Sequence, residues 1–119
     1  MGDIEEIKKI RKGAHDFLLA KKSEVYEKFV EMEKATYKDG AISRKNKELI
    51  GVGISVVTNC ESCMQWHVEE ALVCGASEEE VIEAIEVAME MGGGPATANA
   101  RFALAVMDRF IQKKGPSSL

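Results

Sequence analysis

Apolar residues recur every three to four positions along almost the whole chain, and this periodicity constrains the fold more than any other feature. The chain has only two prolines, Pro95 and Pro116, so long stretches carry no residue that would break a helix. The periodic apolar residues lie among Ala, Glu, Lys and Met, which favour helices. The sequence therefore predicts an all-α fold.

Capping residues at the starts and glycines at the ends divide this pattern into about six helices. The predicted starts include the caps Ser23 and Ser43 and a capping box formed by Ser77 and Glu80. We expect them at residues 3–19, 24–38, 43–57, 60–74, 78–91 and 96–113. The third carries an apolar run, residues 49–57, which predicts a buried central helix. Thr58 and Asn59 offer a cap for the fourth, and the three glycines 92–94 are expected to end the fifth abruptly.

Length and charge narrow the class of protein. A chain of 119 residues builds one core, so residues 1–119 are expected to form a single domain. A net charge of −4 leaves no basic face for phosphates, which argues against a nucleic-acid partner. The first residues are acidic and no window holds 18 apolar residues in a row, so we expect a soluble, cytoplasmic protein without a membrane partner.

Two cysteines and a histidine that could carry out thiol chemistry share one side of the fourth predicted helix. Cys60, Cys63 and His67 stand at positions i, i+3 and i+7, which return to the same face. Dithiol chemistry needs an attacking thiolate, a second sulfur and a group that moves protons near neutral pH. This spacing favours redox work over two other interpretations, which are inert buried cysteines and a metal site with Glu48 as a fourth ligand. We predict no cofactor and no metal.

The two thiols are expected to have different roles. Cys60 lies closest to the helix N-terminus, where the helix dipole favours a thiolate. Cys63 lies one turn before His67, which can take its proton, and a close neighbour of that kind outweighs an exposed dipole. We therefore predict Cys63 as the nucleophile and Cys60 as the resolving thiol. Cys74, near the helix C-terminus, is predicted to serve packing only.

Glu48 lies twelve residues before Cys60. Its neighbours Lys45, Asn46 and Lys47 favour an exposed carboxylate. It would reach the thiols only if the third and fourth helices pack against each other, and it could then fix the tautomer of His67.

These residues together resemble the carboxymuconolactone decarboxylase superfamily, and within it the alkylhydroperoxidase D (AhpD)-like branch. The resemblance covers about residues 23 to 110, and its most specific part is Glu-x11-Cys-x2-Cys-x3-His. Further matching segments are residues 47–50, 60–67, 70–72, 75–80 and 91–96. AhpD itself has a histidine between its cysteines, where this chain has Ser62. The resemblance implies an all-helical fold, with the thiol helix packed on the helix before it, that assembles into homotrimers or homohexamers.

The resemblance also implies roles for the four motif residues. Cys63 takes the position of the thiol that a hydroperoxide oxidises, Cys60 that of its disulfide partner, and Glu48 and His67 those of a proton relay. We expect a peroxiredoxin-type antioxidant oxidoreductase that reduces hydroperoxides and is restored by an external dithiol or thiol. The alternative is a non-redox carboxymuconolactone decarboxylase-like enzyme or a metal-binding oligomeric module.

Overall fold

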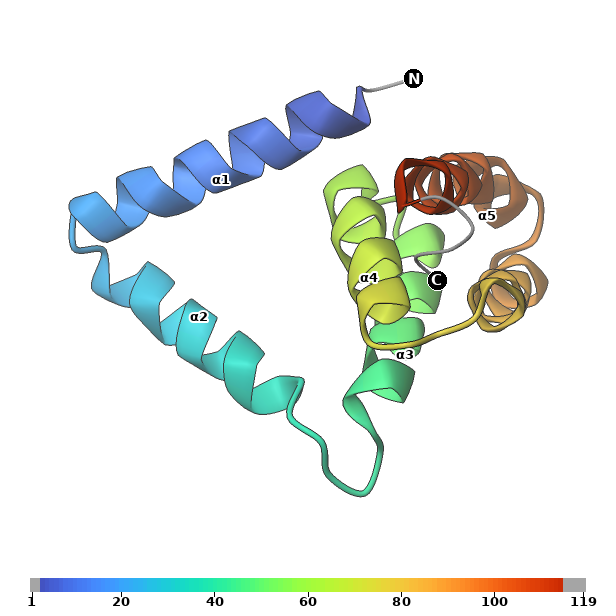
Figure 1. The fold of residues 1–119 in the computed structure, drawn as a ribbon, viewed down its shortest axis with the longest axis horizontal. Coiled ribbons are helices and arrows are strands. Elements are labelled where there is room, and N and C mark those ends of the chain that lie inside the picture. Colours follow the sequence, from blue (N-terminus) through green and yellow to red (C-terminus); the bar gives the residue numbers. More distant parts are fainter. Residues whose placement is uncertain (1–2, 115–119) are drawn as a thin grey trace.

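The computed structural model describes residues 3–114, and within that range it is all-helical (Figure 1). The all-α prediction is therefore confirmed. The helices are α1 (Ile4–Ala20), α2 (Glu24–Thr36), α3 (Arg44–Val57), α4 (Glu61–Val73) and α5 (Glu78–Lys114). Within 3–114, none of these helices is both long and apolar enough to cross a membrane.

Side chains predicted as caps begin three of these helices. The Oγ atoms of Ser23 and Ser43 accept hydrogen bonds from the backbone N–H groups of Tyr26 and Asn46, at 3.2 Å each. At the start of α5, Ser77 and Glu80 exchange bonds of 3.0 and 2.9 Å in the predicted capping box. Each bond satisfies a backbone donor that the first turn leaves unpaired, so the starts of α2, α3 and α5 follow directly from the sequence.

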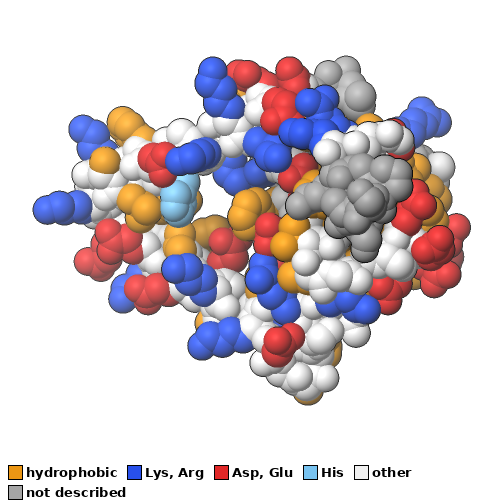
Figure 2. All heavy atoms as spheres, in the orientation of Figure 1, with side chains coloured by type: hydrophobic (Ala, Val, Ile, Leu, Met, Phe, Trp, Pro, Cys, Tyr) orange, Lys and Arg blue, Asp and Glu red, His pale blue; other side chains and the backbone are white. Residues whose placement is uncertain are grey.

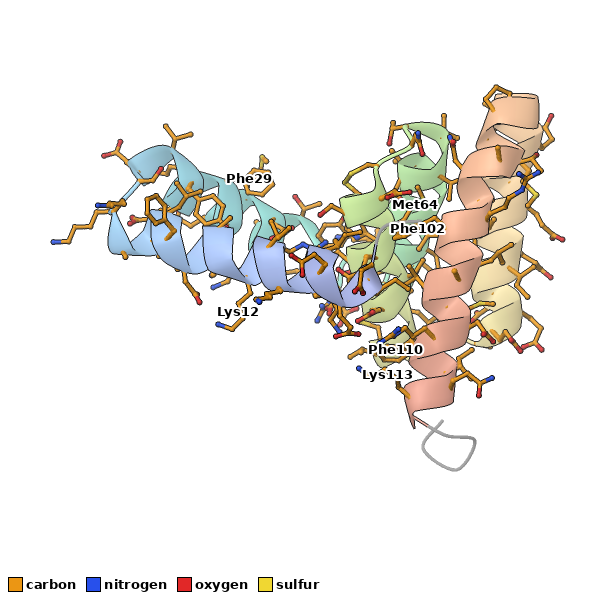
Figure 3. The ribbon with its side chains drawn as sticks, turned by 90° about the horizontal axis from the view of Figure 1, so that it is seen from above. Lys12, Phe29, Met64, Phe102, Phe110 and Lys113 are labelled. Atoms are coloured by element: carbon orange, nitrogen blue, oxygen red, sulfur yellow. A yellow bond between two sulfur atoms is a disulfide. The ribbon has the colours of Figure 1, made fainter. Side chains whose placement is uncertain are left out.

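The core lies between α3, α4 and α5, which pack on one another around aliphatic side chains. Met64 of α4 and Phe102 of α5 lie at the contact between these helices (Figure 3). The C-terminal end of α3 is also tied to α5, because the side-chain amide of Asn99 donates to the carbonyl of Val56 at 2.9 Å. The fully buried aliphatic residues include Val52, Val56, Val68, Val81, Ile85 and Val106.

Gly93 divides α5 into two helical segments at a sharp bend. Its φ of 68° and ψ of −148° are not helical, and the chain resumes a helix at once on either side. Pro95 stands in the first turn of the second segment, where its missing N–H costs nothing. Within residues 3–114 the fifth and sixth predicted helices are therefore present as the two segments of α5, and the expectation that glycines 92–94 separate them is confirmed, with the break at Gly93.

Helices α1 and α2 form an arm that projects from the α3–α4–α5 bundle (Figure 1). α1 touches α4 and α2, and His15 of α1 contacts the hydroxyl of Tyr26 on α2. Only Ile4 of the arm is buried, whereas the side chains of Ile10 and Phe17 are 61% and 60% exposed. Figure 2 shows apolar side chains on this arm among interspersed acidic and basic groups.

The helix predicted to be buried on nearly all sides is covered on one side only. Glu48, Val52 and Val56 of α3 face the bundle, but Ile50 and Ile54 on its other side are 50% and 59% exposed. The apolar run of α3 therefore exceeds what this single chain covers.

Candidate functional site

The two cysteines of the motif lie at the N-terminus of α4. Cys60 is itself the N-cap, because its Sγ accepts the backbone N–H of Cys63 at 3.1 Å. This corrects the expected cap at Thr58 and Asn59: Asn59 instead has a φ of 56°, in the turn that separates α3 from α4. Cys60 and Cys63 are joined in a disulfide with Cα atoms 5.2 Å apart.

Glu48 and His67 form a hydrogen-bonded pair between α3 and α4. Oε1 of Glu48 lies 2.7 Å from Nδ1 of His67, and the Glu48 carboxylate is almost completely buried. A carboxylate only accepts, so Nδ1 must carry the hydrogen, and in the neutral ring Nε2 keeps the lone pair. The structure thus places Glu48 beside His67, against the exposed position that its lysine neighbours suggested.

Gly51 makes this close packing of α3 against His67 possible. A Cβ atom at position 51 would lie 2.9 Å from both Cγ and Nδ1 of His67, closer than real Cβ contacts come. The imidazole therefore rests directly on the backbone of α3. In the sequence, Gly51 stands out only as part of the apolar run at residues 49–57.

Arg44 connects the buried carboxylate to the far end of α4. Its guanidinium contacts Glu48 at 3.5 Å and forms an ion pair with Glu70. Cys74, predicted to serve packing, is a partly buried free thiol near this network. Burial raises the pKa of Cys74, and Glu48 and Glu70 raise it further, while Arg44 opposes them. Cys74 is therefore held in its thiol form and set apart from the disulfide.

Tyr37, at the C-terminal end of α2, brings the arm to the site. Its ring lies 5.4 Å, centroid to centroid, from that of His67. Burial raises the pKa of the Tyr37 phenol, and the negative charges of Glu48 and Glu33 act in the same direction. The phenol therefore stays protonated at neutral pH and can donate a hydrogen bond.

Arg11 of α1 reaches the turn between the two cysteines. Its guanidinium donates to the Oγ of Ser62 at 2.8 Å, and also to the Ser62 carbonyl and the side chain of Gln65. It also lies over the indole of Trp66, 5.4 Å from the ring centroid. Arg11 and Tyr37 were not predicted as site residues, because no local pattern connects their helices to the cysteine motif.

The four predicted residues thus come from two helices: Glu48 lies on α3, while Cys60, Cys63 and His67 lie along the N-cap and first two turns of α4. Among residues 3–114, no group of three or more His, Cys, Asp or Glu side chains has the arrangement of a metal site. What the site offers is a dithiol pair next to a carboxylate–imidazole pair, which is suited to coupled thiol and proton transfer.

Comparison with known proteins identifies the family. The model of the carboxymuconolactone decarboxylase family matches residues 23–106, which is most of the chain. The chain therefore belongs to the carboxymuconolactone decarboxylase family. A curated relative, an uncharacterised protein of the cox locus of Paracoccus denitrificans, is 43% identical over 82 residues, which cover 69% of this chain and 74% of the relative.

Solved structures share the fold over nearly their full length. A carboxymuconolactone decarboxylase family protein of Legionella pneumophila, solved in its apo form, superposes with a TM-score of 0.86 at 30% identity, over 90% of this chain and 96% of that one. A family member from Thermotoga maritima, described in connection with an antioxidative response, gives a TM-score of 0.84 at 24% identity, over 96% and 97% of the two chains. The second likeness concerns the fold alone.

Proposed function

We propose that this protein is a dithiol peroxidase or disulfide reductase of the AhpD-like branch, with hydroperoxides as its oxidising substrates. One observation carries the proposal: the Cys60–Cys63 disulfide caps the helix whose next turn holds His67, bonded to the buried Glu48. The two thiols and the His67 imidazole therefore lie within two turns of one helix, and Glu48 on α3 holds the imidazole.

In the oxidative half, the Cys63 thiolate attacks the terminal oxygen of the hydroperoxide. The O–O bond breaks, Cys63 becomes a sulfenic acid, and the alkoxide leaves as an alcohol after it takes up a proton. The Cys60 sulfur then attacks the Cys63 sulfur, so that a disulfide forms and water leaves. One peroxide thus oxidises two thiols.

In the reductive half, an external dithiol returns two electrons. Its thiolate attacks Sγ of Cys63, the disulfide breaks, and Cys60 leaves as a thiolate. The Cys63 N–H, 3.1 Å from Sγ of Cys60, favours this leaving group because hydrogen bonds to an anion stabilise it. The second thiol of the reductant then closes its own disulfide and releases reduced Cys63.

The Glu48–His67 pair serves both halves as a proton relay. With Nδ1 held by Glu48, Nε2 of His67 is free to take the proton of the Cys63 thiol and later to return it to the leaving alkoxide. The hydrogen bond from Nδ1 to the buried Glu48 carboxylate fixes this tautomer.

Steady-state removal of a small alkyl hydroperoxide, with dithiothreitol as reductant, tests the proposal. We expect turnover in the wild type and in Cys74→Ser, since Cys74 lies outside the dithiol pair. Cys63→Ser should fall to the uncatalysed rate, because a hydroxyl cannot replace the thiolate nucleophile. Equal peroxide removal by the wild type and Cys63→Ser would contradict the proposal and favour the non-redox alternative.

A further inference from the structure

Arg11 makes more contacts with the thiol helix than an arm residue needs for packing. It binds three acceptors on two residues of α4 that flank Cys63, namely Ser62 and the almost fully buried Gln65. It also covers the ring of Trp66. A cation is thus fixed to the residue between the two cysteines from a helix about fifty residues away in sequence.

We propose that Arg11 is a positioning residue for the dithiol site: it holds the turn between Cys60 and Cys63, and its charge favours the thiolate form of Cys63 once the disulfide is reduced. This inference rests on the proposed dithiol function, which it deepens by assigning a role to the N-terminal arm.

The charges around Arg11 come from every element packed near it. Burial lowers the pKa of the Arg11 guanidinium, and the negative charges of Glu69 on α4 and Glu33 on α2 oppose this shift. Glu48 of α3 is bonded to His67, which lies one turn after Cys63 on α4. Because Glu33, Glu69 and Glu48 are acidic, loss of the Arg11 charge leaves the site more negative and disfavours a thiolate.

Two features separate this charge effect from simple anchoring of the arm. The first is chemical: lysine keeps the charge of Arg11 without its planar fork, whereas glutamine keeps a hydrogen-bond donor without the charge. The second is a control residue. Lys8, one turn earlier on α1, forms an ion pair with Glu69 of α4 at 3.2 Å and so also holds the arm on the bundle.

The test measures the pH profile of Cys63 alkylation by iodoacetamide in a reduced Cys60→Ser background, with Cys74 followed on its own peptide. A positive charge within about 4–6 Å lowers the pKa of an acidic group by about 1–3 units. Arg11 is partly solvated and lies beyond Ser62 from Cys63, so its charge should change the thiolate fraction of Cys63 by a smaller factor, about three- to tenfold. We expect Arg11→Gln to slow alkylation at pH 7 by about that factor and to move the profile to higher pH. Arg11→Lys and Lys8→Gln should stay within about twofold of the parent.

Two outcomes would overturn the inference. One is an unchanged profile in Arg11→Gln. The other is an equal shift in Arg11→Gln and in Lys8→Gln or Arg11→Lys, because the effect would then come from arm docking or fork geometry and not from charge. Far-UV circular dichroism of each variant checks that the helices are intact. If Arg11→Gln unfolds, the alkylation profiles of Arg11→Lys and Lys8→Gln are still compared with that of the parent. Alkylation needs no peroxide, so failure here and failure of peroxide turnover are separate results.

Discussion

Gly51 allows the imidazole of His67 to lie on the backbone of α3, within reach of Glu48. Any side chain at position 51 must displace the ring, since a Cβ would stand 2.9 Å from two of its atoms. Gly53, two residues further along the same helix, has its nearest contact at 3.5 Å, which is ordinary van der Waals distance. The two glycines therefore form a natural pair of test position and control.

We predict that Gly51→Ala breaks the Glu48–His67 bond and lowers peroxide turnover about a hundredfold or more, the lower end of a general acid–base contribution. Gly53→Ala should keep turnover and raise the melting temperature by a few degrees, because alanine is better than glycine in a helix by about 1 kcal/mol. Turnover and thermal unfolding measured on both variants check this. Equal turnover in the two variants would mean that the position of His67 is unimportant.

Cys74 gives a prediction on pH. Burial, helped by Glu48 and Glu70, raises its pKa, so less of it is thiolate at a given pH in the folded protein than in the unfolded chain. We therefore expect iodoacetamide to react with Cys74 more slowly in the native protein than in urea, with the native profile moved to higher pH. Peptide mass spectrometry after timed alkylation measures both rates. A native rate equal to or above the rate in urea would contradict a raised pKa of Cys74 in the folded protein.

Local patterns predicted some of these residues and missed others. Cys60, Cys63 and His67 were found from sequence because they lie on one helix, where spacing fixes the shared face. The burial of Glu48 also had a signal, since Val52 and Val56 follow it at i+4 and i+8 on the bundle face, but the neighbouring lysines favoured exposure. Arg11 reaches the site only through tertiary packing, and that contact has no local signal.

At the scale of elements, the bend in α5 depends on Gly93. With φ at 68° and ψ at −148°, it occupies a region that is essentially restricted to glycine. The bend lets both segments of α5 pack on the bundle. Helix starts at Ser23, Ser43 and Ser77 could be predicted because each cap is a local side-chain bond. The position of the bend could not be predicted to the residue, because each of the three adjacent glycines 92–94 could adopt such a conformation.

We predict that Gly93→Ala lowers the free energy of unfolding by about 1–3 kcal/mol, the usual cost of strained backbone. Gly94→Ala is the control: no atom lies within 4 Å of its Cβ position and it has no positive φ, so its effect should stay within about 1 kcal/mol. Denaturant titration at one protein concentration compares them. If the two variants lose equal stability, the bend does not depend on the conformation of Gly93.

At the scale of the whole molecule, the arm leaves the chain more open than a compact domain. The Cα radius of gyration is 14.7 Å, whereas about 13.5 Å is typical of a chain of this length. The accessible surface is 7491 Å². Mass scaling gives about 6,400 Å² for a compact monomer, and the difference exceeds the roughly 800 Å² per partner of a standard interface.

We propose that further copies of this chain cover the apolar side chains that the arm and α3 leave exposed. Figure 3 shows Phe29 projecting from the arm, and Met32 on the same helix is 58% exposed. Light scattering after size-exclusion chromatography should therefore give a multiple of 13.1 kDa, with three or six subunits, and Met32→Glu should shift it towards a single chain. A wild type that stays at 13.1 kDa at every concentration would contradict this assembly.

Mass spectrometry of the reduced protein after one equivalent of hydroperoxide, in the presence of a sulfenic-acid trap, shows whether Cys60 and Cys63 act as a peroxidatic pair. We predict that the wild type forms the Cys60–Cys63 disulfide while Cys74 stays reduced, and that Cys60→Ser yields trapped sulfenic acid at Cys63. If Cys60 and Cys63 both remain reduced in the wild type, the site is not a peroxidatic dithiol and the proposed function is wrong.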